Sequence, residues 1–331
     1  MGHSHRLSKK LIPQTKGKVW YNNPLVDGDY LPQATEEAMT LEALIHITTR
    51  TRIAALTFAV ASAPLPAMAD EVFFSTGSPD GKMATTSQPG TAETETGDDF
   101  VLTQQTSITA ATFTGLLAGG GTVANIGNVV VEIYRVFPAD SNTMRMPNVP
   151  TRVNSPSDVE FVSRDKASGT LSVTTTDMGN FSAQNSVQPG GIHLPSSPPG
   201  GNGPVSGTEV QFNVTFTSPI TLDPDHYFFV PQVELDSGNF LWLSAPRPIV
   251  PPDGTAFPPG FTDLQTWVRD EALQPDWLRV GTDIVGGNPA PTFNASFSLS
   301  TPGPIAGAGL PGLILAGAGL LAWWRRRQRI A

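Results

Sequence analysis

The chain has 331 residues, of which 32 are glycine, 31 are proline and none is cysteine. The absence of cysteine excludes disulfides, thiolate metal sites and cysteine nucleophiles. The net charge of −9 is unevenly spread, because residues 70–304 hold 9 Lys or Arg against 24 Asp or Glu, a net charge of −15. A domain of that charge repels phosphate backbones, so nucleic acid is not expected as a partner.

Residues 1–49 form an N-terminal extension of mixed composition without a clear hydrophobic period. We expect this extension to be poorly ordered, or to lie upstream of the true start of translation. Met39 offers an alternative start close to the segment that follows.

The segment 50–69 has the three parts of a secretory signal peptide. Arg50 and Arg52 form its basic beginning, residues 53–63 its apolar stretch, and Ala67 and Ala69 its A-x-A cleavage site. We therefore expect signal peptidase to cut after Ala69 and residues 70–304 to be exported. The alternative is a buried core helix, which two prolines, at positions 64 and 66, would interrupt.

Ten segments of the exported domain have strand character, and in most of them apolar and polar residues alternate. The expected strands cover residues 71–75, 99–103, 107–116, 128–137, 170–176, 209–217, 226–235, 239–244, 277–280 and 293–300. Long Pro- and Gly-rich loops, such as 186–207 and 246–260, separate them. This pattern predicts an all-β fold, an antiparallel and jelly-roll-like β-sandwich with long loops.

One short helix is expected over residues 262–273, with Thr262 as its N-cap and Asp263 in its first turn. A second helix is expected at the C-terminus, where residues 305–324 are uncharged. That length suffices to cross the ~30 Å hydrocarbon core of a membrane. The cluster that follows is expected to stay on the cytoplasmic side; it consists of Arg325, Arg326, Arg327 and Arg329.

The C-terminal arrangement is Pro302-Gly303-Pro304, then the apolar helix, then the arginine cluster. It resembles the PEP-CTERM family, exported proteins that exosortase sorts in Gram-negative bacteria, commonly ones that make exopolysaccharide. Gly303 stands where that family has Glu, so the sorting signal is a variant. The resemblance covers residues 302–331 and implies an exosortase-like partner. It also implies transient or stable anchoring in the inner membrane, followed by a location at the cell surface or outside the cell.

Four carboxylates are the candidates for a metal site, because hard oxygen ligands suit Ca²⁺. They are Asp98, Asp99, Asp223 and Asp225, which could meet at one end of a sandwich. The alternative for Asp223-Pro224-Asp225 is an Asx-type turn that leads into the next strand. No EF-hand spacing is present, and no cofactor other than Ca²⁺ is expected.

Sugar binding would use exposed aromatic rings, for which Trp242, Trp267 and Trp277 are the candidates. The alternative for these side chains is packing in the core. His193 and His226 are the only histidines of the exported domain, and no G-x-S-x-G motif accompanies them. We therefore expect no enzyme activity.

Three functions are compatible with this sequence. The first is an exported cell-surface or extracellular-matrix protein of a biofilm, sorted by its C-terminus. The second is a carbohydrate-binding module for exopolysaccharide. The third, a secreted hydrolase, requires a histidine and an acid, or two acids, to converge in a pocket.

Overall fold

The computed structural model describes residues 70–90, 92–145, 152–194, 200–303, 318–319 and 325–328. All of them belong to the second of the two units into which the chain divides, Leu65–Ala331. The described residues are mostly β and form two sheets, which confirms the predicted all-β class.

Fifteen strands and two short helical turns are described within residues 70–303. The strands are β1 (Glu71–Ser75), β2 (Met83–Thr86), β3 (Thr94–Val101), β4 (Thr106–Ala118), β5 (Ile126–Arg135), β6 (Val162–Asp165), β7 (Leu171–Ala183), β8 (Asn185–Val187), β9 (Val205–Leu222), β10 (His226–Leu235), β11 (Asn239–Ala245), β12 (Trp267–Asp270), β13 (Leu278–Arg279), β14 (Asn294–Ala295) and β15 (Phe297–Thr301). The turns are the 3₁₀ helix η1 (Val123–Asn125) and the π-helix η2 (Val280–Val285).

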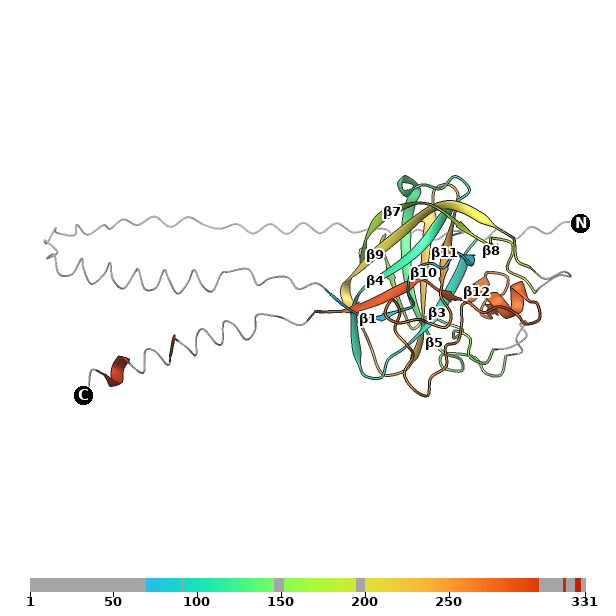
Figure 1. Cartoon of the computed structure of the whole chain (residues 1–331). Coiled ribbons are helices and arrows are strands. Elements are labelled where there is room, and N and C mark those ends of the chain that lie inside the picture. The colour runs from blue at the N-terminus through green and yellow to red at the C-terminus, as the bar shows by residue number, and fades with distance from the viewer. Residues whose placement is uncertain are drawn as a thin grey trace, which may run out of the picture. The chain divides into compact units, whose positions relative to one another are not determined.

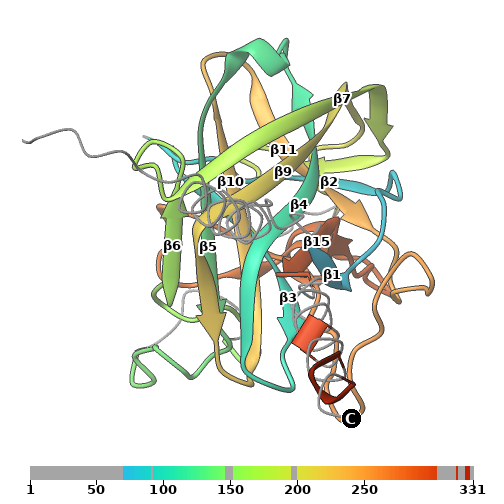
Figure 2. The same ribbon diagram turned by 90° about the vertical axis from the view of Figure 1, so that its left-hand side faces the viewer.

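The larger sheet has nine strands, with the main order β1-β15-β4-β11-β2-β8. β9 adds to it along the whole length of β4, and β7 adds to β9, so these three long strands lie side by side (Figure 1, Figure 2). The smaller sheet has six strands, in the order β13-β12-β3-β10-β5-β6. The strand pairs are antiparallel except for β2 with β8, so the predicted antiparallel pairing holds for the other ladders described.

The main hydrophobic core lies between the two sheets and is rich in phenylalanine. Phe113 and Phe212 stack across β4 and β9, with ring centroids 4.8 Å apart, and Phe229 of the smaller sheet stacks on Phe297 of the larger one at 5.1 Å. Close packing also explains a glycine in β4. A Cβ at Gly115 would lie 2.1 Å from Cε2 of Phe240, so only glycine fits under that ring.

The helix expected over 262–273 is wrong, because residues Trp267–Asp270 form strand β12. This strand pairs in register with Thr94–Gly97 of β3. Trp267 and Val268 enter two different hydrophobic clusters, which is the two-residue alternation of a strand. Pairing with a buried neighbouring strand overrides a local sequence that is compatible with a helix.

The predicted signals at the two ends lie mostly outside the described residues. These include the extension 1–49, the segment 50–69 with Ala67 and Ala69, most of the helix 305–324, Pro304 and Arg329. Pro302 and Gly303 follow β15, and Arg325–Arg327 are exposed in a short helical turn. Within the described part of the chain, no helix has the length and apolarity needed to cross a membrane.

Candidate functional site

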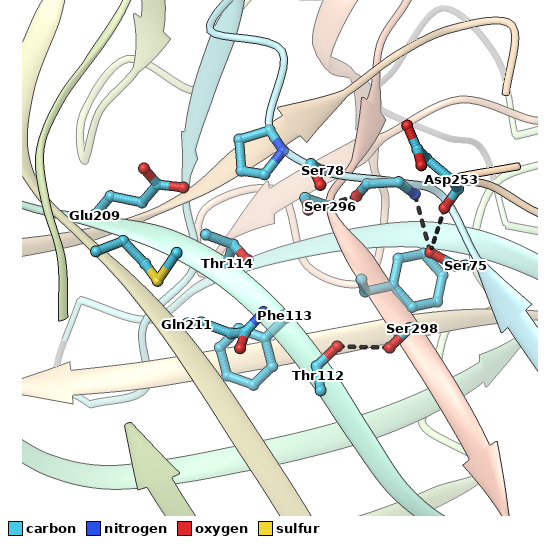
Figure 3. A pocket seen from close by; sticks show the side chains of 14 residues that line it. Ser75, Ser78, Thr112, Phe113, Thr114, Glu209, Gln211, Asp253, Ser296 and Ser298 are labelled. Carbon is cyan, nitrogen blue, oxygen red and sulfur yellow. Dashed lines mark hydrogen bonds between the residues drawn. The ribbon is translucent and has the colours of Figure 1, made fainter. Parts of the chain in front are cut away.

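A polar groove of about 440 Å³ lies on the outer face of the larger sheet, where β4, β9 and β15 run together. Figure 3 shows its floor of hydroxyl and amide side chains. The segment Gly77–Pro79 after β1, and Asp253 from a later loop, form part of its rim. Cavities of this size fall in the range that takes small ligands or segments of a polymer.

The strand register accounts for the polar floor. Phe113, Phe212 and Phe297 point into the core, and successive side chains of a strand point to opposite faces. Their neighbours therefore meet outside, where Thr112 lies opposite both Ser298 and Asn213. The pairing that stacks the phenyl rings within the core thus also gathers the polar side chains on the surface.

Internal hydrogen bonds fix the walls of the groove. Thr112 and Ser298 share a hydrogen bond of 2.5 Å between their hydroxyls. The Ser296 hydroxyl donates to the carbonyl oxygen of Gly77 at 2.8 Å, and the Ser75 hydroxyl donates to that of Asp253 at 3.2 Å. These contacts join the rim segments to β15 and β1, so the shape of the groove is preformed.

Other polar side chains in the groove are left for a ligand. Thr114 of β4 is only 7% exposed, and Gln211 of β9 lies directly opposite it. Neither side chain, nor that of the adjacent Glu209, makes a hydrogen bond to another described residue. None of their polar atoms is among the described buried atoms that lack a partner, so these groups open into the groove and are free to exchange water for a polar ligand.

A second cavity, of about 290 Å³, is lined by acids and lies on the smaller sheet. Its centre is Tyr134, whose hydroxyl contacts Glu95 at 2.8 Å and Glu132 at 3.0 Å. Arg269 pairs with Glu95 and donates to the Tyr134 hydroxyl. Burial, with the negative charge of Glu95, raises the pKa of Glu132 to about 8.

Arg269 ties this acid cluster into the fold. Its guanidinium lies 4.3 Å from the ring centroid of Trp277 and 5.2 Å from that of Tyr134. The buried Glu95 carboxylate is therefore neutralised by a cation that is itself held between two rings. Removal of either partner would leave an uncompensated charge inside the protein, and the charged groups of Arg269 and Glu95 are already paired with each other, so we interpret this cluster as structural.

The four predicted calcium ligands do not form one site. Asp98 and Asp99 are buried in β3 and accept internal hydrogen bonds, Asp98 from the amide of Ala295 at 2.9 Å and Asp99 from that of Leu264 at 3.1 Å. Burial raises the pKa of both carboxyls. The described residues contain no group of three or more His, Asp or Glu placed to hold a metal ion.

Asp223 and Asp225 lie in the turn before β10. Asp223 accepts a hydrogen bond from the Gln105 amide at 2.9 Å. Asp225 accepts one from the backbone N–H of His226, the next residue, at 2.8 Å, whereas an Asx-type turn has a bond to the residue two positions on. These two carboxylates therefore organise the strand entrance.

His226 and Asp99 form a close pair, with Nε2 and Oδ2 2.5 Å apart. Burial lowers the pKa of His226 to about 4, and burial raises the pKa of Asp99. In a serine hydrolase the other ring nitrogen would face a hydroxyl nucleophile. No hydroxyl of a described residue hydrogen bonds to Nδ1 of His226, and Nδ1 of His193 bonds to the carbonyl oxygen of Leu194.

The three tryptophans proposed as sugar platforms are each only 1% exposed. Trp242 packs in the main core, while Trp267 and Trp277 pack in a cluster on the outer face of the smaller sheet. The prediction that they stack on sugars is wrong, because no ring face reaches solvent. The alternative, that these side chains pack in the protein interior, is confirmed for all three.

Sequence reasoning missed the polar groove. Its residues come from β4, β9 and β15, which are about 100 residues apart along the chain. The available signal was the alternation in residues 209–216, where Glu209, Gln211 and Asn213 separate apolar residues. That alternation predicts a polar face, but the partners across it depend on the register.

Comparisons with known proteins were made by family, by sequence and by structure. No protein-family model, no curated protein and no solved structure matches this chain. The polar groove therefore provides the basis for the proposed function.

The raised pKa of Glu132 predicts a pH-dependent stability. From pH 6.5 to about 8 the folded chain keeps a proton that the unfolded chain has released, so the free energy of unfolding falls as pH rises. One pKa unit corresponds to about 1.4 kcal/mol, and we expect this group to account for about 1–2 kcal/mol over that interval. Glu132→Gln, which stays neutral, should show a shallower fall in urea unfolding of the full chain.

Glu234→Gln is the matched control, because Glu234 is an exposed carboxyl on β10 of the same sheet. The free energy of unfolding of this variant should fall with pH as steeply as that of the wild-type chain. Equal slopes for wild type and Glu132→Gln would contradict this assignment.

Proposed function

We propose that residues 70–303 form a polysaccharide-binding, jelly-roll-like β-sandwich that is exported and held at the surface of the cell. The observation that carries this proposal is the convergence of Thr114, Gln211 and Glu209 in a preformed groove without partners among the described residues. Sugar hydroxyls both donate and accept hydrogen bonds, and so do threonine hydroxyls and glutamine amides. The groove is thus chemically matched to a sugar.

The polar surface extends beyond the groove, which favours a polymer over a single sugar. Ser298, Thr112, Asn213 and Thr174 are register partners across β15, β4, β9 and β7. With neighbouring strands about 4.8 Å apart, this row spans roughly 14 Å. A linear polysaccharide lying across the strands would meet polar side chains along several units.

Hydrogen bonds alone would give each sugar unit modest affinity, because they exchange with those of water. The three candidate tryptophans do not contribute a flat platform, since all of them are buried. We therefore propose that affinity accumulates over repeated units and over many copies of the protein at one surface. This is the behaviour of a retention or matrix protein.

The export half of the proposal rests on the signal peptide 50–69 and the variant sorting signal 302–331. Together they support a location of the acidic domain outside the cytoplasm, with the apolar segment and the arginine cluster at the membrane. A protein that is both exported and able to bind polysaccharide would be a surface or matrix component that holds exopolysaccharide.

Export predicts defined termini for the mature protein. Mass spectrometry of the protein recovered from the cells that make it should find Asp70 as the first residue. Cleavage by a sorting enzyme should also remove Arg325–Arg329, whereas stable anchoring would leave them in place. Detection of intact residues 50–69 in the mature protein would contradict the export assignment.

If the groove binds polysaccharide, removal of its free polar side chains should lower the affinity. We expect the double variant Thr114→Val/Gln211→Ala to weaken binding of the full chain about tenfold, since each neutral hydrogen bond contributes about 0.5–1.5 kcal/mol. The measurement is affinity electrophoresis in gels that contain a panel of polysaccharides, with circular dichroism to confirm the fold.

Thr221→Val is the matched control, because Thr221 is exposed on the same strand β9 and lies opposite Ser107, away from the groove. It should bind as the wild type does. Failure of the wild-type chain to bind any polysaccharide would overturn the proposed function.

A further inference from the structure

The charged side chains that line the groove are both acidic. Glu209 and Asp253 lie on opposite sides of it, with Thr114 between them (Figure 3). Among the described residues, no lysine, arginine or histidine lines this groove. Its local charge is therefore negative, as is that of the whole exported domain.

Neither carboxylate is neutralised within the described part of the chain. Glu209 forms no ion pair there, and burial raises its pKa. Asp253 uses its backbone carbonyl, not its side chain, to accept from Ser75. The Glu209 carboxylate opens into the groove without a cation, so an ammonium group on a ligand could make a charge-assisted hydrogen bond with it.

An anionic polymer would find few free cations on this domain. Seven of the nine Lys and Arg of residues 70–304 form ion pairs with Asp or Glu. The other two, Arg164 and Lys166, donate to backbone carbonyls on the smaller-sheet side, at β6 and just after it. The field of the domain therefore favours neutral or cationic ligands over acidic ones.

We propose that the groove binds a polysaccharide whose repeating unit carries a free amino group, a partly N-deacetylated hexosamine polymer. The ammonium lies against Glu209, and neighbouring hydroxyls of the sugar contact Gln211 and Thr114. This inference rests on the proposed polysaccharide binding and specifies its ligand class.

The spacing of the groove suits such a unit. Glu209 and Gln211 are two residues apart on one face of β9, about 7 Å along the strand, and Thr114 lies opposite Gln211. A hexosamine presents its amino group beside a ring hydroxyl, so one unit reaches the carboxylate and the neutral groups together. Charge-assisted hydrogen bonds of ammonium to carboxylate are about twice as strong as neutral ones.

The test compares oligosaccharides of equal length that differ only in N-acetylation. Isothermal titration of the full chain at low salt should give at least tenfold tighter binding to deacetylated glucosamine oligomers than to N-acetylated ones. Glu209→Gln should reduce that preference to about threefold or less. Glu234→Gln, which removes the same charge from an exposed position on the other sheet, should keep the preference.

The outcomes separate this inference from the function on which it rests. Equal binding of acetylated and deacetylated oligomers, or binding only of an acidic polymer bridged by Ca²⁺, overturns the amino-sugar assignment and leaves polysaccharide binding intact. If Glu209→Gln and Glu234→Gln reduce the preference for deacetylated oligomers equally, the attraction to the acidic domain is nonspecific. That result also overturns the amino-sugar assignment. Binding of no polysaccharide of any class removes both.

Discussion

The whole arrangement depends on side-chain alternation in strands that enclose a phenylalanine core. Phe113 and Phe212 stack with their ring planes 4° apart, and Phe229 stacks on Phe297 across the two sheets. A slip of one residue between β4 and β9 would turn these rings to solvent and carry the polar side chains inward. The core therefore selects the register, and the register places the polar groove. The chain has no cysteine, so this packing has to hold the two sheets together without disulfides.

The outer faces of the two sheets have different roles. The smaller sheet is covered by loops, with Trp267 and Trp277 packed on Phe228 and Val230. Arg247 joins Asp263 and Asn294, and so helps to hold the loop before β12 in place. Part of the larger sheet, in contrast, keeps an open polar face. Trp267 and Trp277 are therefore buried, whereas hydroxyl and amide side chains of the larger sheet reach its surface.

The sequence was sufficient to predict the fold class and most of the strands, because alternation is a local property. Residues 209–217 and 226–235 fall within β9 and β10. It failed at Trp267–Asp270, where pairing with β3 decides the structure, and at Asp98 and Asp99, which contact segments more than 160 residues away. Acidic residues are usually exposed, so no pattern in the sequence indicated that Asp98 and Asp99 are buried. The groove was missed for the same reason, since it exists only once Thr114, Gln211 and Ser296 are brought together.

The central claim is that the open polar face of the larger sheet is the binding surface. Methyl-detected NMR of the full chain, titrated with an oligosaccharide that it binds, tests this most directly. The account predicts that the signals of Thr112, Thr114 and Met178 move together and saturate with one affinity, while methyl signals beside Trp267 and Trp277 stay in place. Shifts confined to the smaller sheet, with Thr114 unchanged, would contradict the account.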